Sequence, residues 1–317
     1  MTGAGGHSGA LDPGAARAAV AAVAAACSGH IGLAARHLGT GEELSWQPDE
    51  AIQTASTVKV AVLAEVMRQQ RAGLVDLAAP VTLRASDLAG GSGVLAVLRP
   101  GLGCTVADLC TLMIIVSDNT ATNVLIDLLG GAAVVNRGIA ALGYPGIRLA
   151  HKIGMPPPPL VVTRPEPEPP PPAPIGTATP AGLCRLLAGL HAGTVVDQAA
   201  SAQMITTLRY QQDQSLFPRA FLELAGPDEP PRPGAPALAH KTGCVSDFRA
   251  DTGLLFLPGG GTVAYCAAAD RLADQTMTAL AEGDEIVGRL GAIVLARWWP
   301  GPGPVPVRPG WLPARTG

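Results

Sequence analysis

Ala55-Ser56-Thr57-Val58-Lys59 begins the stretch of sequence that decides the fold. From Ser56 to about Gly73 the chain is largely apolar and contains no proline or internal glycine, a pattern that predicts a long buried helix. Ser56 lies where this helix should begin, a position that serine favours because its oxygen can accept hydrogen bonds from free N–H groups. Lys59 follows three residues later, so the two side chains share one face of the helix, one turn apart.

This Ser-x-x-Lys spacing has a chemical and a structural interpretation. A helix N-terminus favours a developing alkoxide, and a partly desolvated lysine can accept the hydroxyl proton, so Ser56 and Lys59 are a candidate nucleophile and base. Chance copies, with serine as an ordinary cap and lysine on the surface, are the alternative. The composition favours the chemistry, because the chain has only three lysines among its 22 basic residues, and lysine can release a proton near neutral pH whereas arginine cannot.

Strand patterns lie near both ends of the chain. On the N-terminal side a helix leads into the strand Ile31–His37, and on the C-terminal side Gly253–Leu257 and Thr262–Ala268 predict a β-hairpin. A last helix is expected from about Asp274 to Trp298, and most of the intervening sequence is helical. The fold class predicted is α/β (α+β), with one antiparallel sheet built from both chain ends and flanked by helices, plus a helical lobe.

These elements predict a single domain over residues 15–298. The expected parts are a sheet lobe from about 15–55 and 237–298, a helical lobe from about 56–236, and flexible tails at 1–14 and 299–317. Residues 155–174 contain eleven prolines, and because proline lacks the donor N–H and fixes φ, this segment can be neither a helix nor a central strand. It is either a stiff surface loop or a disordered insertion.

Composition argues against several classes of protein. The 317 residues are 48% hydrophobic and 15% charged, which is enough to bury a large core. A net charge of −3 without a basic block, together with 3% aromatic residues, argues against nucleic acid as a partner. The N-terminus lacks a cationic leader and no window reaches about 18 consecutive strongly apolar residues, so we expect a cytoplasmic protein without a membrane partner. Six cysteines without metal-ligand spacing predict reduced core thiols, and nothing implies a metal or an organic cofactor.

Two further polar motifs follow apolar segments. Ser117-Asp118-Asn119 comes after an apolar helical run, and a serine and an asparagine two apart at a helix–loop junction can both face a cleft, although an ordinary polar cap is the alternative. His240-Lys241-Thr242-Gly243 leads through Cys244 towards the predicted hairpin. A lysine and a threonine on an edge strand can hold a substrate carboxylate, and the glycine lets substrate backbone approach closely.

Ser-x-x-Lys, Ser-Asp-Asn and Lys-Thr-Gly, in this order, are the motif set of class A β-lactamases and penicillin-binding proteins, and the chain resembles that family of serine hydrolases. The resemblance extends over roughly Ala15 to Trp298, includes Gly91-Ser92-Gly93-Val94-Leu95, and fails mainly in the proline-rich insertions. It implies the β-lactamase/transpeptidase-like fold, a small-molecule substrate and no cofactor, and leaves the oligomeric state open.

The resemblance also implies a role for each matched residue. Ser56 would be the acylated nucleophile and Lys59 its proton acceptor. Ser117 would pass a proton to the leaving nitrogen, and Asn119 would bind the substrate amide.

On the third motif, Lys241 and Thr242 would hold the substrate carboxylate, beside Gly243. The backbone N–H groups of Ser56 and Cys244 would form the oxyanion hole. The Cys244 thiol would then pack rather than react.

The main departure from the family pattern lies in the proline-rich segment. Class A enzymes have Arg-x-Glu-Pro-Glu-x-Asn there, and the first glutamate activates the water that clears the acyl-enzyme; this chain matches Arg164 and Glu166 but has Pro170 for the asparagine. Gly176 takes the place of the acidic residue that pairs with the arginine. Glu166 is therefore a candidate general base, with accidental low-complexity sequence as the alternative, and the presence of Asn123, which braces this loop in the family, favours a formed loop.

Three functions fit these residues. The first is hydrolysis of a β-lactam or related amide through an acyl-enzyme on Ser56. The second is an intracellular acyl-transfer, amidase or esterase step in small-molecule biosynthesis, which the expected cytoplasmic location favours because antibiotics and cell-wall peptide lie outside. The third is a catalytically inactive binding domain, against which the intact motifs argue.

Overall fold

The computed structural model describes residues 10–155, 173–278, 280–301 and 304–312. The chain divides into two compact units, each assembled from separate segments. Unit 1 consists of Met1–Ile52, Thr179–Ala188 and Gln214–Gly317, and unit 2 of Gln53–Ala178 and Gly189–Asp213. These bounds differ from the expected lobes, because residues 179–188 and 214–236, expected in the helical lobe, belong to unit 1.

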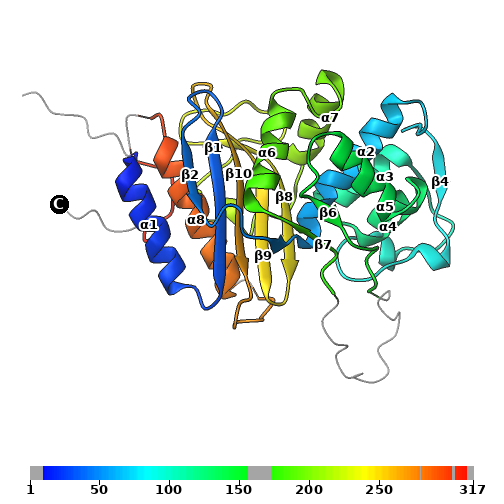
Figure 1. Ribbon diagram of the computed structural model, residues 1–317, viewed down its shortest axis with the longest axis horizontal. Helices are drawn as coiled ribbons and strands as arrows, with labels where there is room; N and C mark the ends of the chain where they lie inside the picture. Colours follow the sequence, from blue (N-terminus) through cyan, green and yellow to red (C-terminus); the bar gives the residue numbers. More distant parts are fainter. Residues whose placement is uncertain (1–9, 156–172, 279, 302–303, 313–317) are drawn as a thin grey trace, which may run out of the picture. The chain divides into compact units, whose positions relative to one another are not determined.

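Unit 1 is built on a five-stranded antiparallel sheet with the strand order β2-β1-β10-β9-β8 (Figure 1). β1 pairs with β10 in the register Ala34↔Cys266, so sequence from the two ends of the chain lies side by side in the sheet. The prediction of one sheet built from both chain ends is confirmed, as is the C-terminal hairpin. The strands are β1 (His30–His37), β2 (Glu43–Trp46), β8 (Ala237–Val245), β9 (Phe248–Phe256) and β10 (Thr262–Asp270).

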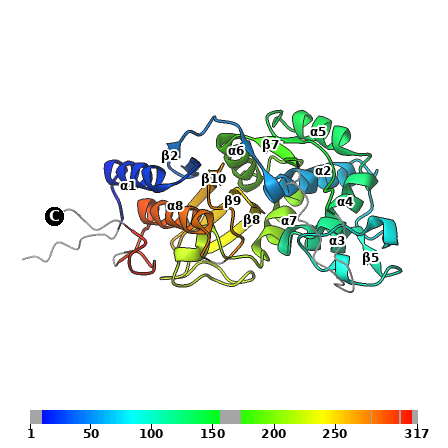
Figure 2. The same cartoon turned by 90° about the horizontal axis from the view of Figure 1, so that it is seen from below.

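Helices cover both faces of this sheet (Figure 2). Successive side chains of a strand point to opposite faces, and Ile31 and Leu33 of β1 pack into one hydrophobic core with α1 (Pro13–Ala26) and α8 (Glu282–Trp298). The first part of α6 (Pro180–His191) lies on the other face, where a Cβ on Gly32 would be 2.8 Å from the Cγ of Pro180. Glycine at position 32 therefore lets α6 approach the sheet.

α8 begins at Glu282, eight residues later than the sequence predicts. The cause is Asp274, whose carboxylate accepts hydrogen bonds from the backbone N–H groups of Thr276 (3.0 Å) and Glu282 (2.8 Å). Such local bonds offer the backbone an alternative to helix. The segment that follows Asp274 is thus held as a loop that closes onto the first residue of α8.

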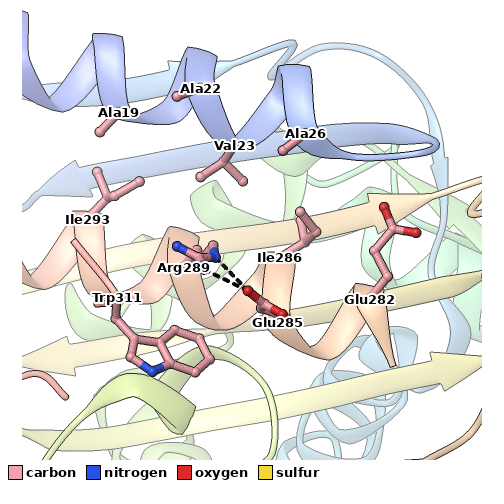
Figure 3. A pocket seen from close by; sticks show the side chains of 10 residues that line it. All are labelled: Ala19, Ala22, Val23, Ala26, Glu282, Glu285, Ile286, Arg289, Ile293 and Trp311. Carbon is pink, nitrogen blue, oxygen red and sulfur yellow. Dashed lines mark hydrogen bonds and ion pairs between the residues drawn. The ribbon is translucent and has the colours of Figure 1, made fainter. Parts of the chain in front are cut away.

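A cavity of about 310 Å³ lies between α1 and α8 and is lined mainly by alanine and isoleucine side chains and by Trp311 (Figure 3). Arg289 of α8 pairs with Glu285 at 2.7 Å and lies 5.7 Å from the centre of the Trp311 ring. The backbone N–H of Arg308 also donates to the carbonyl of Ala220 at 2.8 Å. Residues 304–312 therefore pack onto unit 1, whereas the sequence predicted a flexible tail from residue 299.

Unit 2 is helical, and its α2 (Lys59–Arg71) contacts four other helices of the unit. Every residue from Lys59 to Met67 is buried, which confirms the buried helix predicted from residue 56 onward. The remaining elements are short sheets and helices: α3 (Val106–Ile115), α4 (Asn119–Leu128), α5 (Ala132–Ala141), α7 (Gln198–Arg209), the sheet of β3 (Ile52–Gln53), β7 (Gly176–Ala178) and β6 (Arg148–Leu149), the pair β4 (Pro80–Thr82) and β5 (Gly103–Thr105), and the 3₁₀ turns η1 (Ala55–Val58), η2 (Ala85–Asp87) and η3 (Leu95–Val97), with η4 (Phe217–Ala220) in unit 1.

A buried acidic side chain lies within α2. Glu65 is fully buried and accepts hydrogen bonds from Arg68 Nε (2.7 Å), Arg68 Nη2 (2.8 Å) and Gln69 Nε2 (2.8 Å). A Cβ at Gly138 of α5 would collide with the Glu65 carboxylate. Glycine at this position therefore allows α5 to pack against α2.

Over the described ranges, no single helix has both the length and the apolar character needed to cross a membrane.

Candidate active site

The segment around Ser56 starts with a tight turn rather than a capped α-helix. Residues Ala55–Val58 form the 3₁₀ turn η1, and no side chain caps it, so the expected capping role of Ser56 is not found. Ala55 has φ 41°, a left-handed conformation that is strained for any residue with a Cβ. Ser56 is half-buried, and the backbone N–H of Thr54 donates to the carbonyl of Gly176 at 3.1 Å, which fixes the entry to the turn.

Lys59, the first residue of α2, is completely buried and bonded to the second motif. Its Nζ donates to the Ser117 carbonyl (2.7 Å), to Ser117 Oγ (3.0 Å) and to Asn119 Oδ1 (2.8 Å). An ammonium carries three donor hydrogens, so these acceptors suit its charged form. Ser117 and Asn119 lie 58 and 60 positions after Lys59 in the sequence. The bond between Lys59 Nζ and Ser117 Oγ provides a direct path for a proton between these two side chains.

Ser117 is the second strained residue of this region, with φ 55°. It follows the C-terminus of α3 and precedes Asp118, the N-cap of α4. Non-glycine residues in this conformation persist only where the surroundings hold them, and they are enriched at functional sites. Together with Ala55, Ser117 places backbone strain beside two of the three motifs.

Asp118 and Asn119 hold the loop from Gly90 to Leu95. Asp118 Oδ1 caps α4 by accepting from Ala121 N (2.9 Å), while Oδ2 accepts from Val94 N (2.7 Å) and Leu95 N (2.8 Å). Asn119 Nδ2 donates to the Gly90 carbonyl at 2.8 Å. This loop includes Gly91–Leu95, which the sequence indicated only as similar to the family. Through the Gly90 carbonyl it helps to orient Asn119.

The side-chain amide of Asn123 in α4 bonds both the N–H and the carbonyl of Ile153. Its Nδ2 donates to the carbonyl of Ile153 at 2.9 Å, and its Oδ1 accepts from the N–H at 2.8 Å. Asn123 therefore braces the chain just before the proline-rich segment. Glu166, together with Arg164 and Pro170, lies outside the described residues.

The third motif lies on β8 in unit 1. Lys241, Thr242 and Gly243 are buried, and Lys241 Nζ donates to the Thr242 carbonyl at 2.8 Å. β8 is the last strand in the sheet order, so only β9 pairs with it in the described sheet. The side chain of Cys244 packs against the hydrophobic core of unit 1, as the resemblance implied.

A buried arginine secures the turn that follows Cys244. Arg249, opposite Cys244 in the β8–β9 register, bonds Asp284 of α8 at 2.8 Å through Nε and donates through Nη1 to the carbonyls of Val245 and Phe248. The guanidinium thereby connects β9, the hairpin turn and α8. Because Arg249 is opposite Cys244 and bonds the Val245 carbonyl, it restrains the backbone next to Cys244, the residue whose N–H is expected in the oxyanion hole.

Beneath Lys241 lies a polar cluster that the sequence analysis missed. His240 Nδ1 is 3.0 Å from both carboxylate oxygens of Asp251, and the Tyr265 hydroxyl donates to Asp251 Oδ1 at 3.1 Å. The available signal was an aspartate and a tyrosine in two strands whose residues are mostly apolar.

The structure brings Lys59, Ser117 and Asn119 into direct contact within unit 2 and places Lys241 to Cys244 consecutively on one strand of unit 1. Among the described residues, no group of three His, Cys, Asp or Glu side chains is placed to hold a metal ion. No described cysteine forms a disulfide, and Cys110, Cys184 and Cys266 are buried whereas the other three are only partly so. The expectation of core thiols therefore holds for half of them.

Comparison with known proteins relates the chain to β-lactamases at the level of family, sequence and structure. A family model described as "Beta-lactamase enzyme family" matches residues 15–298. A β-lactamase of Rhodobacter capsulatus is 29% identical over 180 residues, which are 57% of this chain and 58% of that protein. The aligned region thus spans less than two thirds of that relative.

Solved structures extend the similarity over most of the chain. The β-lactamase from Sphaerobacter thermophilus has a TM-score of 0.74 and 32% identity, covering 90% of this chain and 97% of that chain. A mutant of PBP-A, solved as its acyl-enzyme complex with penicillin G, has a TM-score of 0.71 and 23% identity, covering 89% and 94% of the two chains. The second comparison supports the fold, which is that of the β-lactamases and transpeptidases.

Proposed function

Because this chain belongs to the β-lactamase enzyme family, we propose that it is a serine hydrolase that opens a β-lactam or a related amide through an acyl-enzyme on Ser56. The observation that carries the proposal is the contact of the buried Lys59 with Ser117 and Asn119, one turn after Ser56. This arrangement supplies a nucleophile, a base and a proton relay from two separate motifs.

The three acceptors suit the ammonium form of Lys59, so the lysine first gives a proton to solvent, and acylation begins from its neutral form. As Ser56 Oγ attacks the amide carbonyl carbon, its proton passes to Lys59 Nζ, and the carbonyl oxygen becomes an oxyanion. The backbone N–H groups of Ser56 and Cys244 would stabilise that charge, at about 3–4 kcal/mol for each donor. Ala55, with a φ of 41°, directly precedes Ser56. Arg249 bonds the carbonyl of Val245, the residue after Cys244.

Collapse of the tetrahedral intermediate needs a proton on the leaving nitrogen. Ser117 Oγ lies 3.0 Å from Lys59 Nζ, so it can give its own proton to the nitrogen while it takes one from the lysine ammonium. The carbon–nitrogen bond breaks and Lys59 returns to the neutral form. Asn119 keeps Lys59 in place through Oδ1, and Lys241 with Thr242 would hold the substrate carboxylate.

Hydrolysis then requires a base that activates water. Glu166 is the candidate, since it occupies the family's glutamate position in the sequence. It would take a proton from water as the water oxygen attacks the ester carbonyl, and Ser56 would leave with that proton.

Intact-protein mass spectrometry over time with penicillin G tests this proposal. We expect a transient adduct of the penicillin mass that disappears as hydrolysed product accumulates, and no adduct in Ser56→Ala. In Glu166→Gln the adduct should persist, whereas the neighbouring Glu168→Gln should turn over like the parent. Labelling of Ser56→Ala at another residue would contradict the assignment of the nucleophile.

An acyl-transfer enzyme is the second candidate, favoured by Pro170 where the family has the water-holding asparagine. In the same experiment it would give a stable adduct on Ser56 without free product. Release of that adduct by an added amine, but not by water, would identify the acceptor.

A further inference from the structure

The cluster around Asp251 is buried, polar and unused by the proposed reaction. Asp251 and Tyr265 are fully buried and His240 is 3% exposed, all in the layer between the sheet and α8. Asp251 Oδ2 also accepts from the backbone N–H of Phe217 at 3.2 Å. The carboxylate thus has donors from β8, β10 and η4.

A missing side chain makes room for this cluster. Gly253 of β9 is directly opposite His240 in the β8–β9 pair and directly opposite Tyr265 in the β9–β10 pair. The three positions therefore form a row across β8, β9 and β10. A Cβ on Gly253 would lie 2.6 Å from the Cβ of His240. Its absence leaves the space in which the Asp251 carboxylate bonds to both neighbouring strands.

Such a cluster is a poor way to gain stability. Buried ion pairs and polar networks are often matched or exceeded in stability by apolar side chains of similar volume, and their best-attested use is to specify register. Burial and the Asp251 charge both raise the pKa of Tyr265, which keeps its hydroxyl protonated as a donor. The cluster is therefore directional: each bond forms only when β8 and β10 are aligned correctly on β9.

Register matters most on β8. This strand is paired on one side only in the described sheet, and His240 and Lys241 point to opposite faces because successive side chains alternate. A slip of one residue would turn Lys241 into the core and His240 out of it.

We infer that His240, Asp251 and Tyr265 form a register lock for β8, which positions Lys241 and the backbone N–H of Cys244. Its kinetic consequence depends on the proposed function, whereas its structural consequence does not. The three residues are positioning residues, since none of them would touch the substrate.

The decisive variant is the double substitution His240→Leu/Asp251→Leu, which replaces the lock by apolar side chains. We expect its melting temperature to stay near the parent value, while amide hydrogen exchange of residues 241–245 rises about tenfold relative to β1. Acylation by penicillin G, followed by mass, should slow by about 10- to 100-fold, because small misplacements of catalytic groups have effects of that size.

Three further variants separate positioning from stability. His240→Asn keeps a donor near the position of Nδ1 and should retain most of the parent acylation rate. Tyr265→Phe should slow acylation and raise β8 exchange less than the double variant does. These two single variants test the inference even if the double variant does not fold. Leu255→Ala, in the same core layer of β9, should lower the melting temperature without selective exchange in β8.

The inference would be overturned if β8 exchange and the acylation rate of the double variant equal those of the parent. It would also be overturned if, across the variants, the acylation rate falls only in proportion to the melting temperature. If the parent forms no adduct with penicillin G, the proposed function fails, and hydrogen exchange alone still decides whether the lock exists.

Discussion

Lys59 illustrates how much chemistry one side chain can carry at a buried position. Its Nζ donates to a backbone carbonyl, a hydroxyl and a side-chain amide oxygen at 2.7–3.0 Å. The flexible stem and three rotatable donors of lysine can serve such a site, whereas the planar guanidinium of arginine has a fixed fork geometry. In the proposed reaction, this lysine would also lose a proton to become the base.

Replacing Lys59 by arginine should therefore leave the positive charge but remove the base. We expect Lys59→Arg to slow acylation by penicillin G by about 10²- to 10⁴-fold, the usual contribution of a general base. The rate of adduct formation by mass spectrometry measures this. Lys152→Arg, which alters an exposed ion pair with Asp127 (2.7 Å), is the matched control; equal rates in the two variants would remove Lys59 as the base.

At this scale the sequence indicated candidate residues but not their contacts. Ser56 and Lys59 were expected on one face of a single helix, whereas Ser56 lies in the 3₁₀ turn η1 and Lys59 begins α2. The bonds from Lys59 to Ser117 and Asn119 depend on how α3 ends and α4 begins, which no local pattern encodes. The Asp251 cluster escaped for a similar reason, because its members come from three strands.

Among the elements, the loop from Gly90 to Leu95 has a strict requirement for glycine at position 93. Gly93 has φ 103°, and a Cβ there would collide with Asp118. Asp118 in turn caps α4 and holds the N–H groups of Val94 and Leu95. A side chain at Gly93 would have to displace the residue next to Asn119.

Gly93→Ala should consequently lower both stability and acylation. Gly101→Ala is the matched control, because Gly101 also has a positive φ (95°) but a Cβ there would meet nothing within 4 Å. We expect Gly101→Ala to cost about 1–2 kcal/mol of unfolding free energy through backbone strain alone, with normal acylation. Urea unfolding and adduct formation measure the two effects, and equal behaviour of the two variants would contradict a role for this loop in placing Asn119.

The start of α3 makes its stability dependent on pH. Asp108 accepts hydrogen bonds from the backbone N–H (2.8 Å) and hydroxyl (2.7 Å) of Thr105, and these bonds lower the pKa of the Asp108 carboxyl. A carboxyl whose pKa is lower in the folded state stabilises the fold above its unfolded pKa, and this stabilisation disappears as the pH falls through the folded value.

Asp108→Asn should thus cost roughly 1 kcal/mol at pH 7, the typical value of a capping interaction. The difference from the parent should begin to shrink below about pH 4, near the pKa of an unfolded aspartate, and should disappear as the pH falls through the lower pKa of the folded state. Urea unfolding at pH 7 and pH 3 measures both, with Asp127→Asn as a control for the loss of an exposed carboxylate. A difference that stays constant with pH would show that the charge of Asp108 does not contribute.

Whole-molecule architecture was predictable where both chain ends carried the same kind of signal. Short apolar runs beside glycine-containing turns in 31–37 and 253–268 indicated strands near the two termini, and the two meet as β1 and β10. The division into units was less predictable, because the first part of α6 joins unit 1 through Pro180 against Gly32. Contacts that bring distant segments onto a sheet face leave no periodic trace in the segment itself.

The distribution of thiols over the whole molecule gives a last prediction. Burial raises the pKa of Cys110 and of Cys184 to about 12, and burial also raises that of Cys266. Since the thiolate is the reactive form, these three should resist Ellman's reagent at pH 8 in the native protein. Cys27, Cys104 and Cys244 are only partly buried, so at most three thiols should react before unfolding.

Unfolding in guanidinium should then release all six thiols, which distinguishes burial from disulfide formation. Cys104→Ala should reduce the rapidly reacting number by at most one, whereas Cys110→Ala should leave it unchanged and lower only the total. Fewer than six thiols in the unfolded parent would mean that a disulfide forms in solution. More than three in the native state would mean that α6 opens from the sheet or α3 from its neighbours, because Cys184 and Cys110 are covered by those packings.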